Sequence, residues 1–158
     1  MRRFKNKEEM AKLVNETIER SNDDKTMMNG MLDGHLVKCD PDSDTIVIEY
    51  KTKHWQNNRA GFLHGGIMGA MLDLSMGDLS ICYSGALWTP TITLEVKYMR
   101  PTKIGDTVLV EAEMVSNGKR INHLRAKATS KDTGKLLGTA TGTYFAIDTR
   151  VEHNQEIK

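Results

Sequence analysis

The chain has 158 residues, of which 22 are basic and 21 acidic, so its formal net charge is +1. Such a length suits one domain with a single hydrophobic core. The near-neutral charge and the lack of a zinc-finger or similar motif in the sequence argue against nucleic-acid binding, and the longest apolar stretch, residues 67–81, is too short and too polar to span a bilayer.

The first predicted element is an amphipathic helix over about residues 7–21. Asn6, with Glu9 three residues later, gives a capping-box pattern at its start. Mostly apolar side chains then recur at helical spacing, at Met10, Leu13, Val14, Thr17 and Ile18.

Two strands and a long helix come next. Residues 34–39 predict a weak strand, and residues 45–51 alternate between apolar and polar side chains, as a half-buried strand does. After a loop at 56–61, an apolar helix runs over about residues 65–84, and Gly85 follows as its C-cap.

Four further strands are predicted at about 91–98, 108–114, 123–128 and 139–146, because apolar residues occupy every second position. Short turns between alternating strands are typical of an antiparallel sheet with one wet face, and the long helix has to cover the other face. We therefore predict an α+β fold in which an antiparallel sheet wraps around a central helix. One domain spans 1–158, with its core over about 34–148 and a flexible polar tail over 149–158.

One carboxylate, Asp73, stands in the middle of the apolar helix. An unpaired charge there costs several kcal/mol, so it has a partner or a function. The positions three, four and seven residues away hold mostly small side chains, which leaves room for a slim ligand such as a pantetheine arm or for a partner's backbone. The alternative is that Asp73 pairs with a buried cation or caps a loop, and that the small side chains serve helix packing.

The same helix begins with Gly65 and Gly66. A helix N-terminus presents unpaired N–H groups to a developing negative charge, which predicts a polarised carbonyl there. Alternatively, the two glycines only permit a tight turn.

A longer motif surrounds these residues: Asn58-x-x-Gly61-x-x-His64-Gly65-Gly66, followed by Asp73. With Tyr98-Met-Arg-Pro101, Gly105-Asp106, Asn117-Gly-Lys119 and the final strand, it resembles the hotdog-fold acyl-CoA thioesterases of the PaaI-like and THEM2-like group over about residues 45–147. The resemblance implies a hotdog fold and hydrolysis of an acyl-CoA thioester to free acid and coenzyme A. It implies no cofactor, because coenzyme A is part of the substrate.

By the same resemblance, the Gly65 N–H and the Asn58 side chain hold the thioester carbonyl, and Asp73 is general base or nucleophile. Thr91 stands where related enzymes carry a serine that helps to position water, and Gly66 belongs to the substrate site. The alternative is that Asn58 caps its loop.

His64 is expected to shape the site through a hydrogen bond, since Asp73 already supplies a base. Two basic clusters in loops after strands are candidate ligands for the coenzyme A phosphates, although surface cations usually only solvate. They are Arg100 and Lys103, and Lys119 and Arg120.

Gly65 and Asp73 are eight residues apart on one helix, or roughly 12 Å at 1.5 Å per residue. One carboxylate side chain cannot bridge that gap. We therefore expect Asp73 to come from a second subunit, in a homodimer or a dimer of dimers with antiparallel central helices and two sites per dimer.

Two other functions stay open: a non-catalytic acyl-CoA-binding protein and a hotdog hydratase or dehydratase. The histidines, cysteines and carboxylates lack metal-ligand spacing, so no metal is expected. Two lone cysteines and a basic N-terminus without a following apolar run predict a cytoplasmic protein. Asp33-Gly34-His35 resembles the motif of another thioesterase branch but precedes the first strand, and Asp78 is expected to be a polar position near the helix end.

Overall fold

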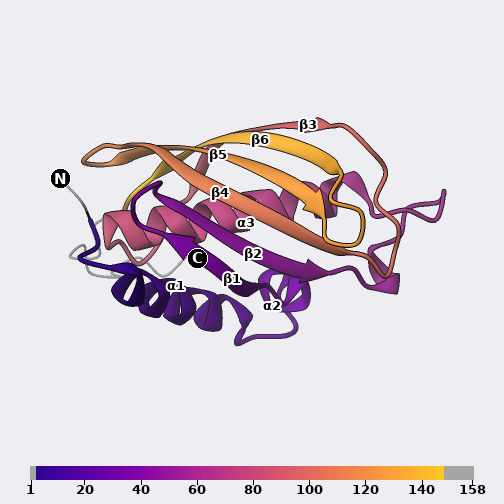
Figure 1. The fold of residues 1–158 in the computed structure, drawn as a ribbon, viewed down its shortest axis with the longest axis horizontal. Helices are drawn as coiled ribbons and strands as arrows, with labels where there is room; N and C mark the ends of the chain where they lie inside the picture. The colour runs from indigo at the N-terminus through magenta and orange to yellow at the C-terminus, as the bar shows by residue number, and fades with distance from the viewer. Residues whose placement is uncertain (1–2, 148–158) are drawn as a thin grey trace, which may run out of the picture.

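The computed structural model describes residues 3–147, so the tail predicted at 149–158 lies outside the described residues. Its centre is a six-stranded sheet in which every neighbouring pair is antiparallel, in the order β1-β2-β4-β5-β6-β3 (Figure 1). The strands are β1 His35–Asp40, β2 Thr45–Lys51, β3 Thr91–Tyr98, β4 Thr107–Asn117, β5 Ile121–Ser130 and β6 Leu136–Phe145.

Helix α3, Gly65–Ser84, lies along the concave face of this sheet (Figure 1). Its C-cap Gly85 has a φ of 68°, the left-handed conformation that favours glycine. The core forms where α3 meets the inward-facing positions of the strands, which the alternating pattern had indicated. Buried side chains there include Ile46, Ile48, Val108, Val110, Met71, Leu72 and Met76. The predicted antiparallel α+β architecture is confirmed.

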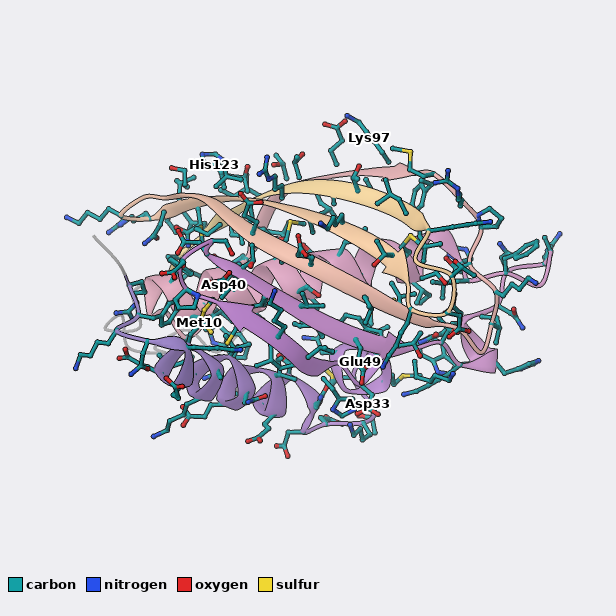
Figure 2. All side chains as sticks on the ribbon, in the orientation of Figure 1. Met10, Asp33, Asp40, Glu49, Lys97 and His123 are labelled. Carbon is teal, nitrogen blue, oxygen red and sulfur yellow. The ribbon has the colours of Figure 1, made fainter. Side chains whose placement is uncertain are left out.

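Helix α1, Lys7–Asn22, packs beside the sheet, and Figure 2 shows Met10 on the side of α1 that faces it. The Asn6 side chain accepts a hydrogen bond from the Glu9 N–H at 2.8 Å, as the capping pattern predicts. Helix α1 also covers the β1 edge: Asn22 Nδ2 donates to the Gly34 carbonyl at 2.8 Å, and Cys39 Sγ lies 3.6 Å from the Lys7 carbonyl oxygen.

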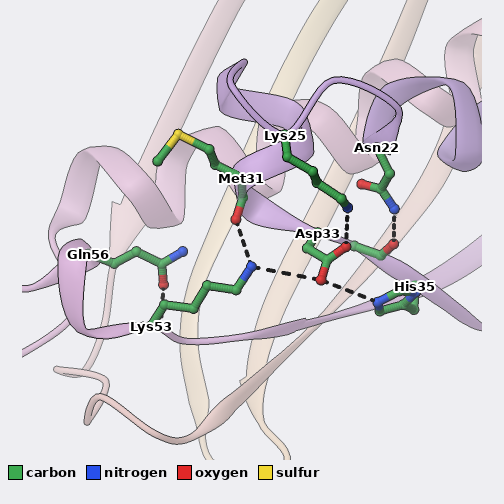
Figure 3. A network of polar contacts seen from close by, with 8 residues as sticks. Asn22, Lys25, Met31, Asp33, His35, Lys53 and Gln56 are labelled. Carbon is green, nitrogen blue, oxygen red and sulfur yellow. Dashed lines mark hydrogen bonds and ion pairs between the residues drawn. The ribbon is translucent and has the colours of Figure 1, made fainter.

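A second short helix, α2, Met28–Leu32, was not predicted, because five residues are too few to display a helical period. It ends at Asp33, whose φ is 59°. Figure 3 shows Lys25, His35 and Lys53 around the Asp33 carboxylate. Its oxygens lie 2.6 Å from Lys25 Nζ and 3.8 Å from Lys53 Nζ. The hydrogen bond from Lys25 holds the pKa of Asp33 below its usual range. Asp33, at the end of α2, therefore pairs with Lys25, which precedes α2, and with Lys53, which follows β2.

Strand β3 differs from the expectation of one buried face. It pairs only with β6 and forms one edge of the sheet, and Ile92 and Leu94 are 53% and 38% exposed. Its neighbour in the chain, β4, lies three strands away in the sheet. The alternation of β3 was therefore read correctly, but among residues 3–147 most of its apolar side chains stay exposed.

None of the helices described over residues 3–147 is long and apolar enough to cross a bilayer.

Candidate active site

Asp73 is partly buried on α3, and hydroxyl groups hold its carboxylate. Thr91 Oγ1, at the start of β3, donates to Asp73 Oδ1 at 2.9 Å, and Tyr144 OH, near the end of β6, donates to the same oxygen at 2.9 Å. Tyr144 also contacts the Asp73 carbonyl oxygen at 3.1 Å. Among residues 3–147 no cation pairs with Asp73 and no donor reaches its Oδ2. The alternative in which Asp73 pairs with a buried cation is therefore wrong.

The start of α3 leaves one amide unused. His64 is the N-cap, and its Nδ1 accepts the Gly66 N–H at 3.0 Å. Within the described part of the chain, the Gly65 N–H has no acceptor. Neither glycine has a positive φ, so a left-handed turn is not the reason for the pair. Gly65 keeps a free donor, whereas the donor of Gly66 is already used.

Asn58 lies beside this helix start. Its Oδ1 caps the loop by accepting the Ala60 and Phe62 N–H groups at 2.9 and 3.1 Å. No group within residues 3–147 accepts from its Nδ2. The two roles considered for Asn58 are thus compatible, because one amide oxygen caps the loop while the nitrogen remains available as a donor.

The small side chains of α3 make room for tyrosines of the sheet rather than an open channel. A Cβ on Gly69 would lie 3.5 Å from the Tyr98 hydroxyl oxygen, and one on Gly77 would lie 3.7 Å from Tyr144 Cε1. Tyr98 OH also donates to the Gly65 carbonyl at 2.8 Å. The expected open path around Asp73 is therefore partly filled by these two rings.

Two separate cavities contain the two halves of the predicted site. One, of about 350 Å³, is lined by Asn58 and Gly65 together with Tyr98 and Arg100. The other, of about 490 Å³, is lined by Asp73 with Ala70, Leu74, Thr91, Tyr144 and Trp88. Within one chain, the carbonyl-binding donors and the carboxylate do not meet.

The four basic residues that are candidates for phosphate binding lie in two different places. Arg100 lines the Asn58 cavity, and its Nη1 donates to the Leu136 carbonyl at 2.8 Å. Lys119 and Arg120 lie in the exposed β4–β5 turn. Asn122, just after this turn, donates a hydrogen bond from Nδ2 to Ser80 Oγ at 2.9 Å. The turn therefore lies near the C-terminal end of α3, and Ser80 is roughly 22 Å along the helix from Gly65. Lys103 is bridged to Phe62 in the loop next to Asn58.

Asp78, which we expected to be a polar position near the helix end, is buried. It is 2% exposed, borders the Asp73 cavity and accepts a hydrogen bond from Ser21 Oγ at 3.2 Å. Burial raises the pKa of Asp78 to about 7, against the opposing effects of the Ser21 hydrogen bond and of Arg20. The apolar residues on both sides of Asp78 in the sequence indicated that it is buried. Its place near the end of the helix had instead favoured a merely polar position.

Sequence reasoning gave no role to Tyr98 or Tyr144. Tyr144 had been placed correctly on the buried face of its strand, and a buried tyrosine hydroxyl needs a polar partner. The small residue Gly77, one turn from Asp73 on the facing helix, was the available signal that a ring packs there. Among residues 3–147, no group of three histidine, cysteine or carboxylate side chains is placed to hold a metal ion.

Comparisons with known proteins place these features in context. Residues 60–137 match the family model described as the thioesterase superfamily. Acyl-coenzyme A thioesterase 13 of Mus musculus is 27% identical over 108 residues, which cover 68% of this chain and 76% of that protein.

Two solved structures share the fold. The zebrafish thioesterase superfamily member 2 superposes with a TM-score of 0.76 at 20% identity, over 87% of this chain and 98% of that one. The E. coli PaaI protein from the phenylacetic acid degradation operon gives a TM-score of 0.74 at 14% identity, over 88% and 96%. The hotdog fold expected from the resemblance is confirmed.

Proposed function

The chain belongs to the thioesterase superfamily through residues 60–137, and on that premise we propose that it hydrolyses an acyl-CoA thioester to a free carboxylic acid and coenzyme A. The observation that carries the proposal is the state of Asp73. Its carboxylate has two hydroxyl donors, no cationic partner among residues 3–147 and a free oxygen beside a cavity. Such a carboxylate is available as a base or nucleophile rather than used in an ion pair.

The second half of the chemistry lies at the start of α3. The thioester carbonyl oxygen accepts hydrogen bonds from the Gly65 N–H and Asn58 Nδ2, which stabilise the negative charge that develops on it. In one route Asp73 removes a proton from water, the water oxygen bonds to the carbonyl carbon, and the thiolate of coenzyme A leaves with the free acid formed. In the other, Asp73 attacks the carbonyl carbon and the thiolate leaves, which gives an anhydride with Asp73; water then hydrolyses this anhydride to the free acid and restores the carboxylate. His64 holds the first turn of the helix in place through its bond to Gly66.

Because these two halves lie in different cavities, the proposed site needs two copies of the chain. Strand β3 supports a specific arrangement. Its first residue, Thr91, contacts Asp73, and its last residue, Tyr98, contacts Gly65. If two β3 edges pair antiparallel about a two-fold axis, the Gly65 end of one copy lies beside the Asp73 end of the other.

The exposure of β3 favours the same assembly. An edge strand with exposed Ile92 and Leu94 presents unpaired backbone groups and apolar side chains, which a second copy would cover. The resulting homodimer has two sites. A dimer of dimers would contain two such homodimers and would keep the same two sites in each. Antiparallel α3 helices also bring the turn with Lys119 and Arg120 of one copy toward the Arg100 and Lys103 end of the other, where the coenzyme A phosphates would bind.

The proposed reaction uses a carboxylate, water and hydrogen-bond donors, and therefore requires no cofactor or metal ion. Thiol release by protein dialysed against a chelator should equal that of untreated protein. We also propose a cytoplasmic location, which the two free, buried cysteines Cys39 and Cys82 support, since a reducing compartment keeps them so.

The experiment is free-thiol release from acyl-CoAs ranging from acetyl to palmitoyl, with phenylacetyl and benzoyl added, by the wild type and by Asp73→Asn. We expect turnover on at least one thioester, reduced about 100-fold or more in the variant, equivalent to about 2.7 kcal/mol of barrier. Saturable binding without turnover on any thioester would indicate the non-catalytic binding protein instead. Loss of the enoyl chromophore of crotonyl-CoA without free thiol would indicate a hydratase.

A further inference from the structure

We propose that Tyr144 is a positioning residue for the reaction, which orients the Asp73 carboxylate so that Oδ2 alone faces the substrate. The inference rests on the proposed function and adds a residue to its site. Tyr144 does not touch the carbonyl-binding half of the site; its effect passes through Asp73.

The geometry of the donors carries this inference. Tyr144 OH and Thr91 Oγ1 both approach Asp73 Oδ1 at 2.9 Å, from two different strands. Two donors on one carboxylate oxygen fix the rotation of the carboxyl group about its last bond and occupy that oxygen. Since no group among residues 3–147 donates to Oδ2, this second oxygen is the one left for a water or a carbonyl carbon.

Tyr144 is built rigidly into this position. Its side chain is 1% exposed, and its ring lies over Gly77 of α3 and beside Gly142 of its own strand, where a Cβ would come within 2.7 Å of Tyr144 Cε2. The ring therefore has little freedom to turn its hydroxyl elsewhere. Burial, reinforced by the negative charge of Asp73, raises the pKa of Tyr144, so the hydroxyl keeps its proton and acts as a donor to the carboxylate.

A purely structural reading of the same contact is that the buried hydroxyl merely needs a partner. The Asp73 carbonyl oxygen, at 3.1 Å, could serve as that partner alone. The carboxylate oxygen is nevertheless the nearer of the two, and Thr91 converges on it independently. The two readings differ in what removal of the hydroxyl changes: folding stability only, or also the behaviour of the carboxylate.

The test compares Tyr144→Phe with a matched control, Tyr50→Phe. Tyr50 is also 1% exposed, and its hydroxyl lies 2.9 Å from Ser75 Oγ on the same helix, away from Asp73. Both variants lose one buried hydroxyl that contacts α3, so both should lose folding stability to a similar degree. Only Tyr144→Phe should lower kcat, by roughly tenfold or more, with KM within about twofold of the wild type.

The pH dependence of kcat supplies a readout that lost packing would not move. A carboxylate that has lost a donor is less stabilised in its ionised form, so the acid limb of the kcat profile should shift to higher pH in Tyr144→Phe. Thr91→Val should shift it in the same direction, and Thr91→Ser, which keeps the hydroxyl, should restore the wild-type profile.

If Tyr144→Phe retains wild-type kcat and profile while Asp73→Asn is inactive, the positioning role is wrong and the thioesterase proposal stands. If the wild type hydrolyses no thioester, the proposed function fails and this role fails with it. Measuring the wild type, Asp73→Asn and Tyr144→Phe side by side keeps these two failures apart.

Discussion

His64 and Gly66 form a closed cap at the start of α3: the Nδ1 atom of His64 lies 3.0 Å from the Gly66 nitrogen and accepts its proton. An imidazole nitrogen that accepts a backbone N–H is not free to accept a proton from water. The contact therefore favours the site-shaping role over that of general base, and it leaves the Gly65 N–H as the amide without an acceptor at this end of the helix, within residues 3–147.

Replacement of His64 separates these two roles. His64→Asn preserves a good N-cap acceptor and should keep kcat within a fewfold of the wild type, whereas His64→Ala should cost about 1 kcal/mol of stability and reduce kcat further. Chemical denaturation and thiol release measure the two effects. A loss of about 100-fold in both variants, with little change in stability, would instead make the imidazole a reacting group.

Mixing two inactive variants tests whether the site is shared between copies. Asn58→Ala removes a carbonyl donor from one half and Asp73→Asn removes the carboxylate from the other. In a mixed dimer, one site combines both defects and the second site combines an intact Asn58 with an intact Asp73. We expect activity to return after the two proteins are unfolded and refolded together, toward about a quarter of the wild-type rate for random pairing.

As a control, Leu94→Glu is added to both variants of that mixture, which places a charge on the β3 edge. It should prevent dimer formation, as measured by light scattering, and should abolish the recovery of activity. Absence of recovery in dimers that do form would place the whole site within one chain.

The proposed contacts to the coenzyme A phosphates can be tested with a shorter substrate. Arg100→Ala and the double variant Lys119→Ala/Arg120→Ala should raise KM for an acyl-CoA but leave KM for the matching acyl-pantetheine, which lacks the nucleotide, close to the wild-type value. Lys127→Ala is the control, because Lys127 pairs with Glu111 at 2.8 Å on the outer side of the sheet. Equal effects on both substrates would argue against phosphate binding.

Asp78 should make folding stability depend on pH. Because burial raises its pKa from about 3.8 to about 7, the folded state holds a proton between these values that the unfolded state has lost. The contribution to stability is therefore fully present below about pH 4 and is lost as pH rises through about 7, at up to ~1.4 kcal/mol per pH unit.

Urea denaturation between pH 4.5 and 8 measures this dependence. Asp78→Asn cannot ionise and should flatten it, whereas Asp23→Asn, at an exposed position, should leave the slope of the wild type. A wild-type curve that rises over this interval would contradict the raised pKa.

Local patterns were enough to predict most of the elements. The long helix was placed at 65–84 and the second strand at 45–51, as the structure has them, because period and caps are properties of neighbouring residues. The pairing of β3 with β6 was not predicted, since it joins residues that are between 40 (Tyr98 and Gly138) and 53 (Thr91 and Tyr144) positions apart and leaves no trace in either strand alone.

The candidate site residues that lie within the sequence motif could be predicted. Those that lie far away in the sequence could not. Asn58, Gly65 and Asp73 were identified from their spacing and from the resemblance. Tyr144 reaches Asp73 across 71 positions of sequence, and only the sheet brings them together. In the same way, the two separate cavities follow from where β3 lies, although the length of the helix had already indicated that Gly65 and Asp73 act in different places.

Among the described residues, the two edges of the sheet are unlike: α1 covers β1, whereas β3 pairs only with β6. A sheet with two bare edges can add chains without end, as fibres do. In the proposed dimer, one β3–β3 pairing uses the free edge of both chains and leaves no edge for a further copy. In that assembly, the N-terminal helix α1 would limit the sheet to two chains.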